Sequence, residues 1–464
     1  MIGVGFDFGT SNSTVAWFDG KQLHYVQLEA SGPIMPTAIH LDREFSDTTG
    51  AAAIDLYVEE NRARRVELVA ELVGEQAMGI TDSSSPEQMS SLQTERQGVY
   101  GPLADRGLPG RLFLGIKRLL GSGQVERLQV FDRHYRLVAL MTPILAKMRQ
   151  RAEQETGQPL ASVHLGRPVN FEGGETATNR IATARLTEAA DHAELRNIAF
   201  YPEPVAASLS YLHQNPSQQS TLALTFDFGG GTLDLSVIRC IDTQFEVLAT
   251  AGIGLGGDRI DQLIYRELLF PLLGKGENWR RRVDGQWLQT PFPFEEFEDA
   301  LLNWAITYTL NQNHFTAKVN DGIAMGGEAA IKFERLKDLI NFNYSYNVIA
   351  AIKKAKAELS TADSTLLDIP EINVTLTFTR ARLDQILDKV MGEITGVMDK
   401  VLASAGMTPD AIDVVVRTGG SSQIVAVRNL LNRYFPGKVT EHDPFTSVAG
   451  GLAIANYFGY KFES

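Results

Sequence analysis

One short phrase occurs twice in this chain, as Phe6-Asp7-Phe8-Gly9 and again as Phe226-Asp227-Phe228-Gly229. A buried strand that ends in aspartate and then turns on glycine places a carboxylate at the strand end, facing whatever binds there. Glycine lets the backbone approach a ligand closely and point N–H groups at it, which suits a phosphate. Hydroxyl groups beside the two turns add hydrogen-bond donors: Thr10, Ser11, Ser13 and Thr232.

A single phrase of this kind is more often just a tight turn, but two facing copies could hold a polyphosphate from both sides. Asp7 and Asp227 would then lie near a Mg²⁺ ion and contact it through water, because Mg²⁺ gives up its waters reluctantly. A third glycine-rich strand end, at 417–421, favours nucleotide binding further. The repetition therefore predicts that one triphosphate and its metal ion are held from two sides, by one glycine turn from each copy.

The elements around the two copies follow the same plan. Each copy predicts a three-stranded meander, with strands at 2–8, 13–18 and 23–28 and at 222–227, 232–241 and 245–250. Helices are predicted at 58–70, 137–156, 175–193, 204–212, 259–273, 299–316, 347–359, 379–405 and 447–458, and short strands at 162–165 and 413–417. Surface loops are predicted at 83–101 and 274–298. Alternating strands and helices indicate an α/β protein with two duplicated halves.

Composition narrows the classes of function. The 464 residues carry a formal charge of −13, which argues against sequence-independent binding of nucleic acid. The single cysteine fits a reducing compartment, and the eight histidines form no metal-binding pattern along the sequence. We find no signal peptide and no apolar run long enough for a membrane span, so we expect a cytoplasmic protein without membrane or nucleic-acid partners.

Six segments resemble, in order, the nucleotide-site motifs of the DnaK-type heat-shock chaperones, which share a superfamily with actin and hexokinase. These segments are GFDFGTSNSTVA (5–16), EPVAASLSY (203–211), FDFGGGTLDLSV (226–237), GLGGDRID (254–261), KKAKAELS (353–360) and RTGGSSQI (417–424). Three further segments, LGRPVNFEG, YPEPVAASL and FTSVAGGLA, are most similar to the divergent bacterial YegD type of this family.

The resemblance implies a fold and a domain division. The fold is the two-lobed actin/hexokinase/heat-shock-chaperone ATPase fold, with duplicated ribonuclease-H-like cores and inserted subdomains. We expect one core at 1–42, 150–215 and 443–464 with an insertion at 43–149, and the other at 216–261 and 375–442 with an insertion at 262–374.

The resemblance also implies Mg²⁺-dependent hydrolysis of ATP to ADP. Lys117 would stabilise the transition state, Glu203 would position the attacking water, and Asp227 and Thr232 would complete the catalytic set. Asp7 and Asp227 match the aspartates that organise the metal. The expected nucleotide-binding residues are Gly9, Thr10, Ser11, Asn12, Gly229, Gly230, Gly231, Thr232, Gly256, Gly257, Lys356, Ser360, Gly419, Gly420, Ser421 and Gln423.

The sequence departs from the family pattern at three points. Lys353 stands where the family has glutamate, and Gln423 stands where the family has the arginine that stacks on adenine, so we expect weaker binding of adenine. The sequence also ends soon after the helix predicted at 447–458, which leads us to expect no peptide-binding domain. A client or co-chaperone protein remains an expected partner.

Two alternatives stay open. A small-molecule kinase of the same superfamily would use the same phosphate clamp, and an actin-like scaffold would use ATP as a structural switch. The GIGLGG segment at 252–257 also fits a dinucleotide-binding pattern, but the sequence after it does not continue as a βαβ unit.

Overall fold

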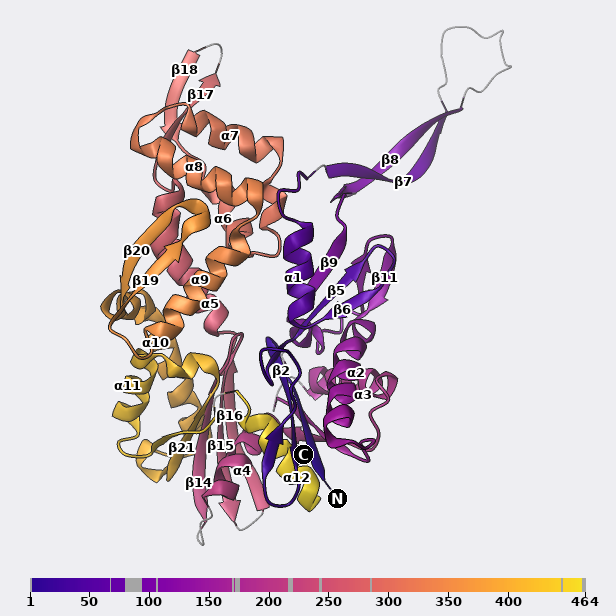
Figure 1. Ribbon diagram of the computed structural model, residues 1–464, viewed down its shortest axis with the longest axis vertical. Coiled ribbons are helices and arrows are strands. Elements are labelled where there is room, and N and C mark those ends of the chain that lie inside the picture. Colours follow the sequence, from indigo (N-terminus) through magenta and orange to yellow (C-terminus); the bar gives the residue numbers. More distant parts are fainter. Residues whose placement is uncertain are drawn as a thin grey trace.

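The computed structural model describes residues 2–66, 68–79, 94–105, 107–168, 171, 176–215, 220–241, 244–283, 286–443 and 445–460. Two halves, each built around its own sheet, lie beside one another (Figure 1). Helices and strands alternate along the chain, which confirms the predicted α/β class. No helix in the described ranges is long and apolar enough to cross a membrane.

The first sheet has the strand order β13-β12-β1-β2-β3, with β4 paired to β2. Its strands are β1 (Gly3–Phe8), β2 (Asn12–Phe18), β3 (Leu23–Tyr25), β4 (Met35–Pro36), β12 (Val163–Arg167) and β13 (Ile198–Pro202). Side chains of β1 alternate between two faces. Val4, Phe6 and Phe8 pack into a core with helices α2 (Leu137–Thr156) and α3 (Thr176–His192).

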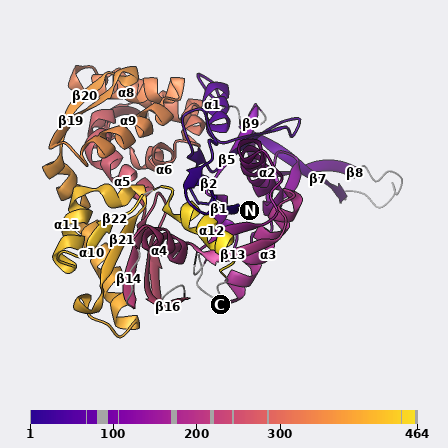
Figure 2. The ribbon, with the colours of Figure 1, turned by 60° about the horizontal axis from the view of Figure 1, so that its bottom comes forward.

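The opposite face of β1 carries glycines because a helix lies directly on it. A Cβ atom on Gly3 would lie 2.2 Å from the carbonyl oxygen of Ala453, and one on Gly5 would lie 2.3 Å from that of Ala449. Both carbonyls belong to α12 (Ser447–Phe458), so the last helix is fixed against the first strand. Figures 1 and 2 show α12 and α4 (Glu203–Gln214) side by side between the two sheets.

The second sheet repeats this plan in the order β16-β15-β14-β21-β22. Its strands are β14 (Thr221–Phe228), β15 (Leu233–Ile241), β16 (Gln244–Ile253), β21 (Val414–Thr418) and β22 (Val439–Glu441). In each sheet an antiparallel hairpin is followed by a parallel strand on its other side: β12 beside β1, and β21 beside β14. Helices α10 (Arg380–Ser404) and α11 (Val425–Tyr434) belong to this half, and α10 packs on β15 and β16.

The remaining elements are inserted into the two halves. The first half carries β5 (Ala38–Asp42), β6 (Asp47–Thr49), α1 (Ala51–Glu60), β7 (Leu68–Gly79), β8 (Thr94–Asp105), β9 (Gly110–Leu114), β10 (Arg127–Val130) and β11 (Arg133–Arg136). The second carries α5 (Gly257–Ile264), β17 (Asn278–Val283), β18 (Gln286–Pro291), α6 (Glu295–Leu302), α7 (Asn313–Ile323), α8 (Gly327–Phe342), α9 (Ser345–Glu358), β19 (Ser364–Ile369) and β20 (Val374–Thr379).

The two inserted regions touch each other. The Tyr57 hydroxyl donates a hydrogen bond to the carbonyl oxygen of Ala305, and the Val66 N–H donates to that of Asn311 at 3.1 Å. The Arg64 guanidinium lies 4.7 Å from the centre of the Tyr308 ring. The two halves therefore meet through their insertions as well as through α4 and α12.

The insertions are also where the sequence predictions were wrong. The helix predicted at 58–70 is α1 at Ala51–Glu60, and β7 begins at Leu68. The helix predicted at 299–316 is broken into α6, a short 3₁₀ helix at Thr307–Leu310 and α7. The polar loop predicted at 274–298 contains the β17–β18 hairpin. Of the loop predicted at 83–101, residues 94–101 belong to β8 and the rest lie outside the described residues.

Candidate nucleotide site

The two glycine turns face each other between the sheets. One joins β1 to β2 and the other joins β14 to β15, where the Gly229 N–H donates to the Thr232 carbonyl oxygen at 3.1 Å. A Cβ atom added to Gly230 would lie 2.7 Å from Ser11 Oγ, so the turns of the two halves are in near contact. The repeated phrase therefore comes together in space, although its copies lie far apart in sequence.

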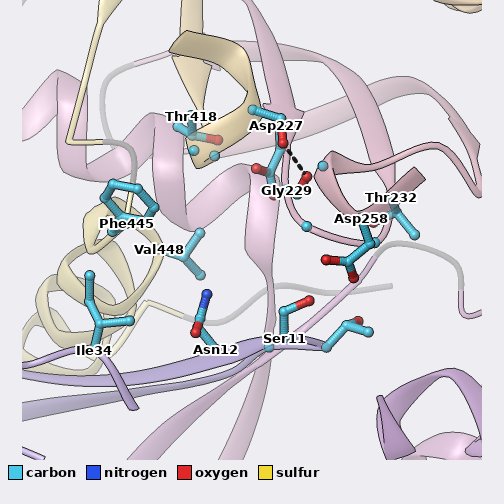
Figure 3. Close-up of a pocket in the computed structure, with 18 of the residues that line it drawn as sticks. Ser11, Asn12, Ile34, Asp227, Gly229, Thr232, Asp258, Thr418, Phe445 and Val448 are labelled. Atoms are coloured by element: carbon cyan, nitrogen blue, oxygen red, sulfur yellow. Dashed lines mark hydrogen bonds between the residues drawn. The ribbon is translucent and has the colours of Figure 1, made fainter. Parts of the chain in front are cut away.

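A cavity of about 410 Å³ opens at these turns. Figure 3 shows Ser11, Gly229, Thr232 and Asp258 around it, with Asp227 next to Gly229. Most of the residues predicted for catalysis, nucleotide binding and metal binding line it. These are Asp7, Gly9, Thr10, Ser11, Asn12, Lys117, Glu203, Asp227, Gly229, Gly230, Gly231, Thr232, Gly257, Lys356, Ser360, Gly419, Gly420 and Ser421. The exceptions are Gly256 and Gln423.

Lys117 and Glu203 form an ion pair at the inner wall of this cavity. Lys117 lies on a 3₁₀ helix at Ile116–Leu119 that follows Gly115, whose left-handed φ of 64° starts the turn. Glu203 is the first residue of α4. The Lys117 ammonium donates to Glu203 Oε1 at 2.6 Å, and the lysine side chain is only 7% exposed. The pair thus combines a buried cation with a carboxylate held at a helix start.

Two aspartates next to this pair have strongly raised pKa values. Burial, followed by repulsion from Glu203, raises the pKa of Asp7 to about 8. Burial, followed by repulsion from Asp234 and Glu203, raises the pKa of Asp227 to about 7. Burial lowers the pKa of Lys117, but the nearby carboxylates of Glu203 and Asp7 more than offset this, and its pKa lies above the usual value. Negative charge exceeds positive charge at this point, which favours a bound cation.

The donor chemistry of these aspartates fits Mg²⁺, which prefers carboxylate and water oxygens. Within the described ranges, however, no group of three or more His, Cys, Asp or Glu side chains is arranged to hold a metal directly. The fit to Mg²⁺ therefore rests on Asp7 and Asp227, the carboxylates that would hold such an ion.

The second glycine turn is supported by loops of its own half. The Ser421 hydroxyl donates to the Gly229 carbonyl oxygen at 2.8 Å, and the Asp258 N–H donates to that of Gly230 at 2.8 Å. Gly256 does not line the cavity because it lies behind this turn, where a Cβ atom would lie 2.2 Å from the Gly230 carbonyl oxygen. It supports the turn rather than contacting a ligand.

Lys356, on α9, is held toward the cavity by a buried partner. Its ammonium lies 2.6 Å from Asp261 Oδ1 and donates to the Gly257 carbonyl oxygen at 3.2 Å. Asp261 is 2% exposed, and burial raises its pKa even though Lys356 opposes that rise. Lys353, one turn earlier, lies 3.4 Å from Asp258 and is half exposed.

Gln423 was predicted to contact the nucleotide, but its side chain lies outside the cavity. Its side-chain amide donates a hydrogen bond to Glu441 Oε1 at 2.6 Å, at the edge of the second sheet. This bond holds the Gln423 side chain outside the cavity. Ser13 also differs from expectation: it is buried and hydrogen-bonded to Thr37 at 2.8 Å instead of reaching the cavity.

Sequence reasoning missed several residues that line the cavity: Thr14, Ile34, Asp234, Asp258, Asp261, Ala357, Thr418, Ile424, Phe445, Ser447 and Val448. Asp234 is the most important because it lies beside Asp227 in the hairpin and accepts a hydrogen bond from the Thr232 hydroxyl at 2.7 Å. Its position seven residues after Asp227 carried a usable signal, since cross-strand partners in a hairpin share a face.

Comparison with protein families matches residues 120–276 and 333–456 to the Hsp70 protein family. The matched segments together make up more than half of the chain, and they include the second glycine turn, Glu203, Lys356 and the loop at Gly419–Ser421. Members of this family have the actin/hexokinase type of ATPase fold, so the match confirms the predicted fold class and supports an ATP-binding, chaperone-like protein. This chain belongs to the Hsp70 family.

Proposed function

We propose that this protein binds ATP with Mg²⁺ in the cavity between its two glycine turns and hydrolyses it slowly to ADP and phosphate. The observation that carries the proposal is the meeting of Lys117, Glu203, Asp7 and Asp227 where the two turns face each other. A buried lysine paired with the partly buried Glu203, beside two partly buried aspartates, serves no packing purpose that apolar residues would not serve better. It suits the transfer of a phosphoryl group.

In the proposed reaction the two turns bind the phosphates through backbone N–H groups, and the hydroxyls of Thr10 and Ser11 add further donors. The Thr232 hydroxyl joins them when it turns from Asp234 to the nucleotide. Glu203 accepts a hydrogen bond from the attacking water and orients it toward the γ-phosphorus. The water forms a new P–O bond as the bond to the bridging oxygen breaks, and ADP leaves with the electron pair of that bond. One proton of the water stays on the product phosphate, and the other passes by way of Glu203 to solvent. Lys117 stabilises the negative charge on the γ-phosphoryl oxygens.

Asp7 and Asp227 would hold Mg²⁺ through its waters. When bound, the ion would neutralise negative charge on the phosphates. The raised pKa values of both aspartates fit this role, because burial and the neighbouring carboxylates disfavour their charged forms and a nearby cation would offset this.

We propose closure of the two lobes as the output of hydrolysis, because the turns that would bind the same phosphates belong to different sheets. The contacts of Tyr57 with Ala305 and of Val66 with Asn311 already join the insertions above the cavity. We further propose the YegD type within the family, a cytoplasmic location, a client or co-chaperone partner, and the domain division given above.

Phosphate release from ATP by the purified protein with Mg²⁺ tests the central proposal. We expect slow release, reduced at least about 100-fold in Lys117→Ala with ATP binding retained, because the lysine acts on the transition state. Lys332→Ala is the matched control: its ammonium lies 2.6 Å from Glu277, as Lys117 does from Glu203, but away from the cavity. Full turnover by Lys117→Ala would remove this residue from catalysis.

A second candidate, transfer of the phosphoryl group to a small molecule, is favoured by a second cavity of about 430 Å³. It shares its inner wall with the first cavity, namely Thr10, Lys117, Glu203, Asp227, Thr232 and Asp234. Arg118, Lys400, Ser236 and Thr250 line the rest of it together with apolar residues. A molecule bound there would face the γ-phosphate. ATP binding without phosphate release in the experiment above would support this candidate over hydrolysis.

A further inference from the structure

The nucleotide cavity has two chemically different ends. The phosphate end carries the glycine turns and the charged groups around Asp227. The other end is apolar, and Figure 3 shows Phe445, Val448 and Ile34 grouped there, away from Asp227 and Thr232. If a nucleoside triphosphate binds with its phosphates on the turns, its base must lie toward this apolar end.

The residue expected to contact the base is not available. By resemblance to the family, an arginine at the position of Gln423 would stack on adenine, but Gln423 lies outside the cavity and donates to Glu441. A base bound in the cavity therefore needs a different partner.

Phe445 has the properties of such a partner. Its side chain is 48% exposed, and among the described residues that line the cavity it is the only aromatic one. One edge of the ring packs on Gly420, where an added Cβ atom would lie 2.8 Å from Phe445 Cε1. An aromatic ring that is exposed inside a cavity is suited to stack on a flat ligand.

The backbone that carries this ring is held in place by its surroundings. Asp443 Oδ1 accepts hydrogen bonds from the backbone N–H groups of Phe445 at 3.1 Å and of Thr446 at 3.2 Å, immediately before α12 begins. Helix α12 is itself fixed to β1 by the close contacts at Gly3 and Gly5. Phe445 is thus presented from the first half of the molecule toward the Gly419–Ser421 loop of the second half.

We propose that Phe445 is the residue that stacks on the base of the bound nucleotide, in the role that the family gives to an arginine. Stacking on a neutral ring depends on the area of the base, so purines bind better than pyrimidines, and Phe445 is the source of that preference. Contact between base and ring also joins the two halves when a nucleotide binds. The proposal rests on the proposed nucleotide site.

The test compares ATP, CTP and inorganic tripolyphosphate, each with Mg²⁺, by calorimetry on the full chain. We expect Phe445→Ala to weaken ATP binding about 5- to 150-fold, the range measured for stacking of one base on an aromatic side chain. CTP should lose less, and tripolyphosphate should be unaffected. Phe342→Ala is the matched control, because Phe342 is 43% exposed but lies on α8 away from the cavity.

Two further variants, Phe445→Trp and Phe445→Leu, distinguish loss of the aromatic ring from misfolding of Phe445→Ala. Tryptophan keeps the aromatic face, so ATP affinity should be retained and the indole fluorescence should be quenched by ATP but not by tripolyphosphate. Leucine keeps apolar area without that face and should behave like alanine. Equal loss of ATP and tripolyphosphate binding in Phe445→Ala, or no loss of either, would overturn the proposal. Failure of the unmodified protein to bind either ligand would overturn the nucleotide site itself.

Discussion

The two glycine-turn hairpins share a backbone plan but differ in the side chains that they bring to the cavity. In the first, Asp7 pairs across the strands with Thr14; in the second, Asp227 pairs with Asp234 at the corresponding register. The first hairpin therefore contributes one carboxylate and a hydroxyl, and the second contributes two carboxylates. Both hairpins have the same backbone arrangement, but the second brings more negative charge to the cavity than the first.

The turns differ in a complementary way. The first carries side chains at Thr10 and Ser11, where the second has Gly230 and Gly231. A Cβ atom on Gly230 would lie 2.7 Å from Ser11 Oγ, and one on Gly231 would lie 2.1 Å from an Arg118 nitrogen. The glycines of one half thus leave room for side chains of the other. Duplicated turns can approach this closely only because they are no longer identical.

The largest expected effect comes from removing one carboxylate from each hairpin. Asp227→Asn should weaken ATP binding about 10- to 100-fold in Mg²⁺ and much less in EDTA, because the side chain acts through the metal. Asp7→Asn should weaken ATP binding in Mg²⁺ at least as much. The first hairpin has Thr14 where the second has Asp234, so no second carboxylate of that hairpin remains to contact the metal environment. Calorimetry in both buffers measures the difference. Equal losses with and without Mg²⁺ would remove these aspartates from the metal environment.

A smaller effect should follow from closing the space between the turns. Gly230→Ala should lower the free energy of unfolding by about 1–3 kcal/mol, the usual cost of inserting a methyl group into a packed region. Adding Ser11→Gly should recover most of that loss, because the clash is with Ser11. Gly254→Ala is the control, since its Cβ would meet nothing within 4 Å. Denaturant unfolding of the unmodified protein, Gly230→Ala, Ser11→Gly and the double variant gives the coupling, and strict additivity would contradict contact between the turns.

How far the sequence could predict this site depends on how local each signal is. Strand β1 and its turn were predicted from a few consecutive residues, and the helix predicted at 447–458 agrees with α12. Ile34 carries no such signal, because it reaches the cavity only after distant segments have packed. Phe445 begins the segment FTSVAGGLA, but that resemblance did not assign it to the site. Gln423 shows the opposite case: its position in the motif predicts a ligand contact, but a nearby acceptor, Glu441, takes its amide elsewhere.

The insertions were predicted less well than the cores, again for a physical reason. The charged stretch at 58–70 has residues that favour helices, yet Ala63 adopts a left-handed φ of 55° and the chain then enters β7. Pairing with β8 decides that segment, and strand pairing depends on contacts that a helix pattern does not reveal.

An effect that depends on pH concerns the parallel strands beside the hairpins. His164 on β12 lies opposite Gly5, where the second sheet has Val416 opposite Thr225. Burial lowers the pKa of His164 to about 4, and its Nδ1 atom is buried with no hydrogen-bond partner. The unfolded chain therefore binds a proton more readily than the folded protein. Stability due to neutral His164 is present above pH 6.5 and is lost as the pH falls toward 4.

His164→Val should copy the second sheet and remove this dependence. The full loss between pH 6.5 and 4 is about 3 kcal/mol for a group with this pKa shift. The variant should unfold with a free energy that changes less over this range than that of the unmodified protein, whereas His134→Val, an exposed change on β11, should follow the unmodified curve. Parallel curves for His164→Val and the unmodified protein would show that the histidine is accommodated in its charged form, and that the two sheets tolerate acid alike.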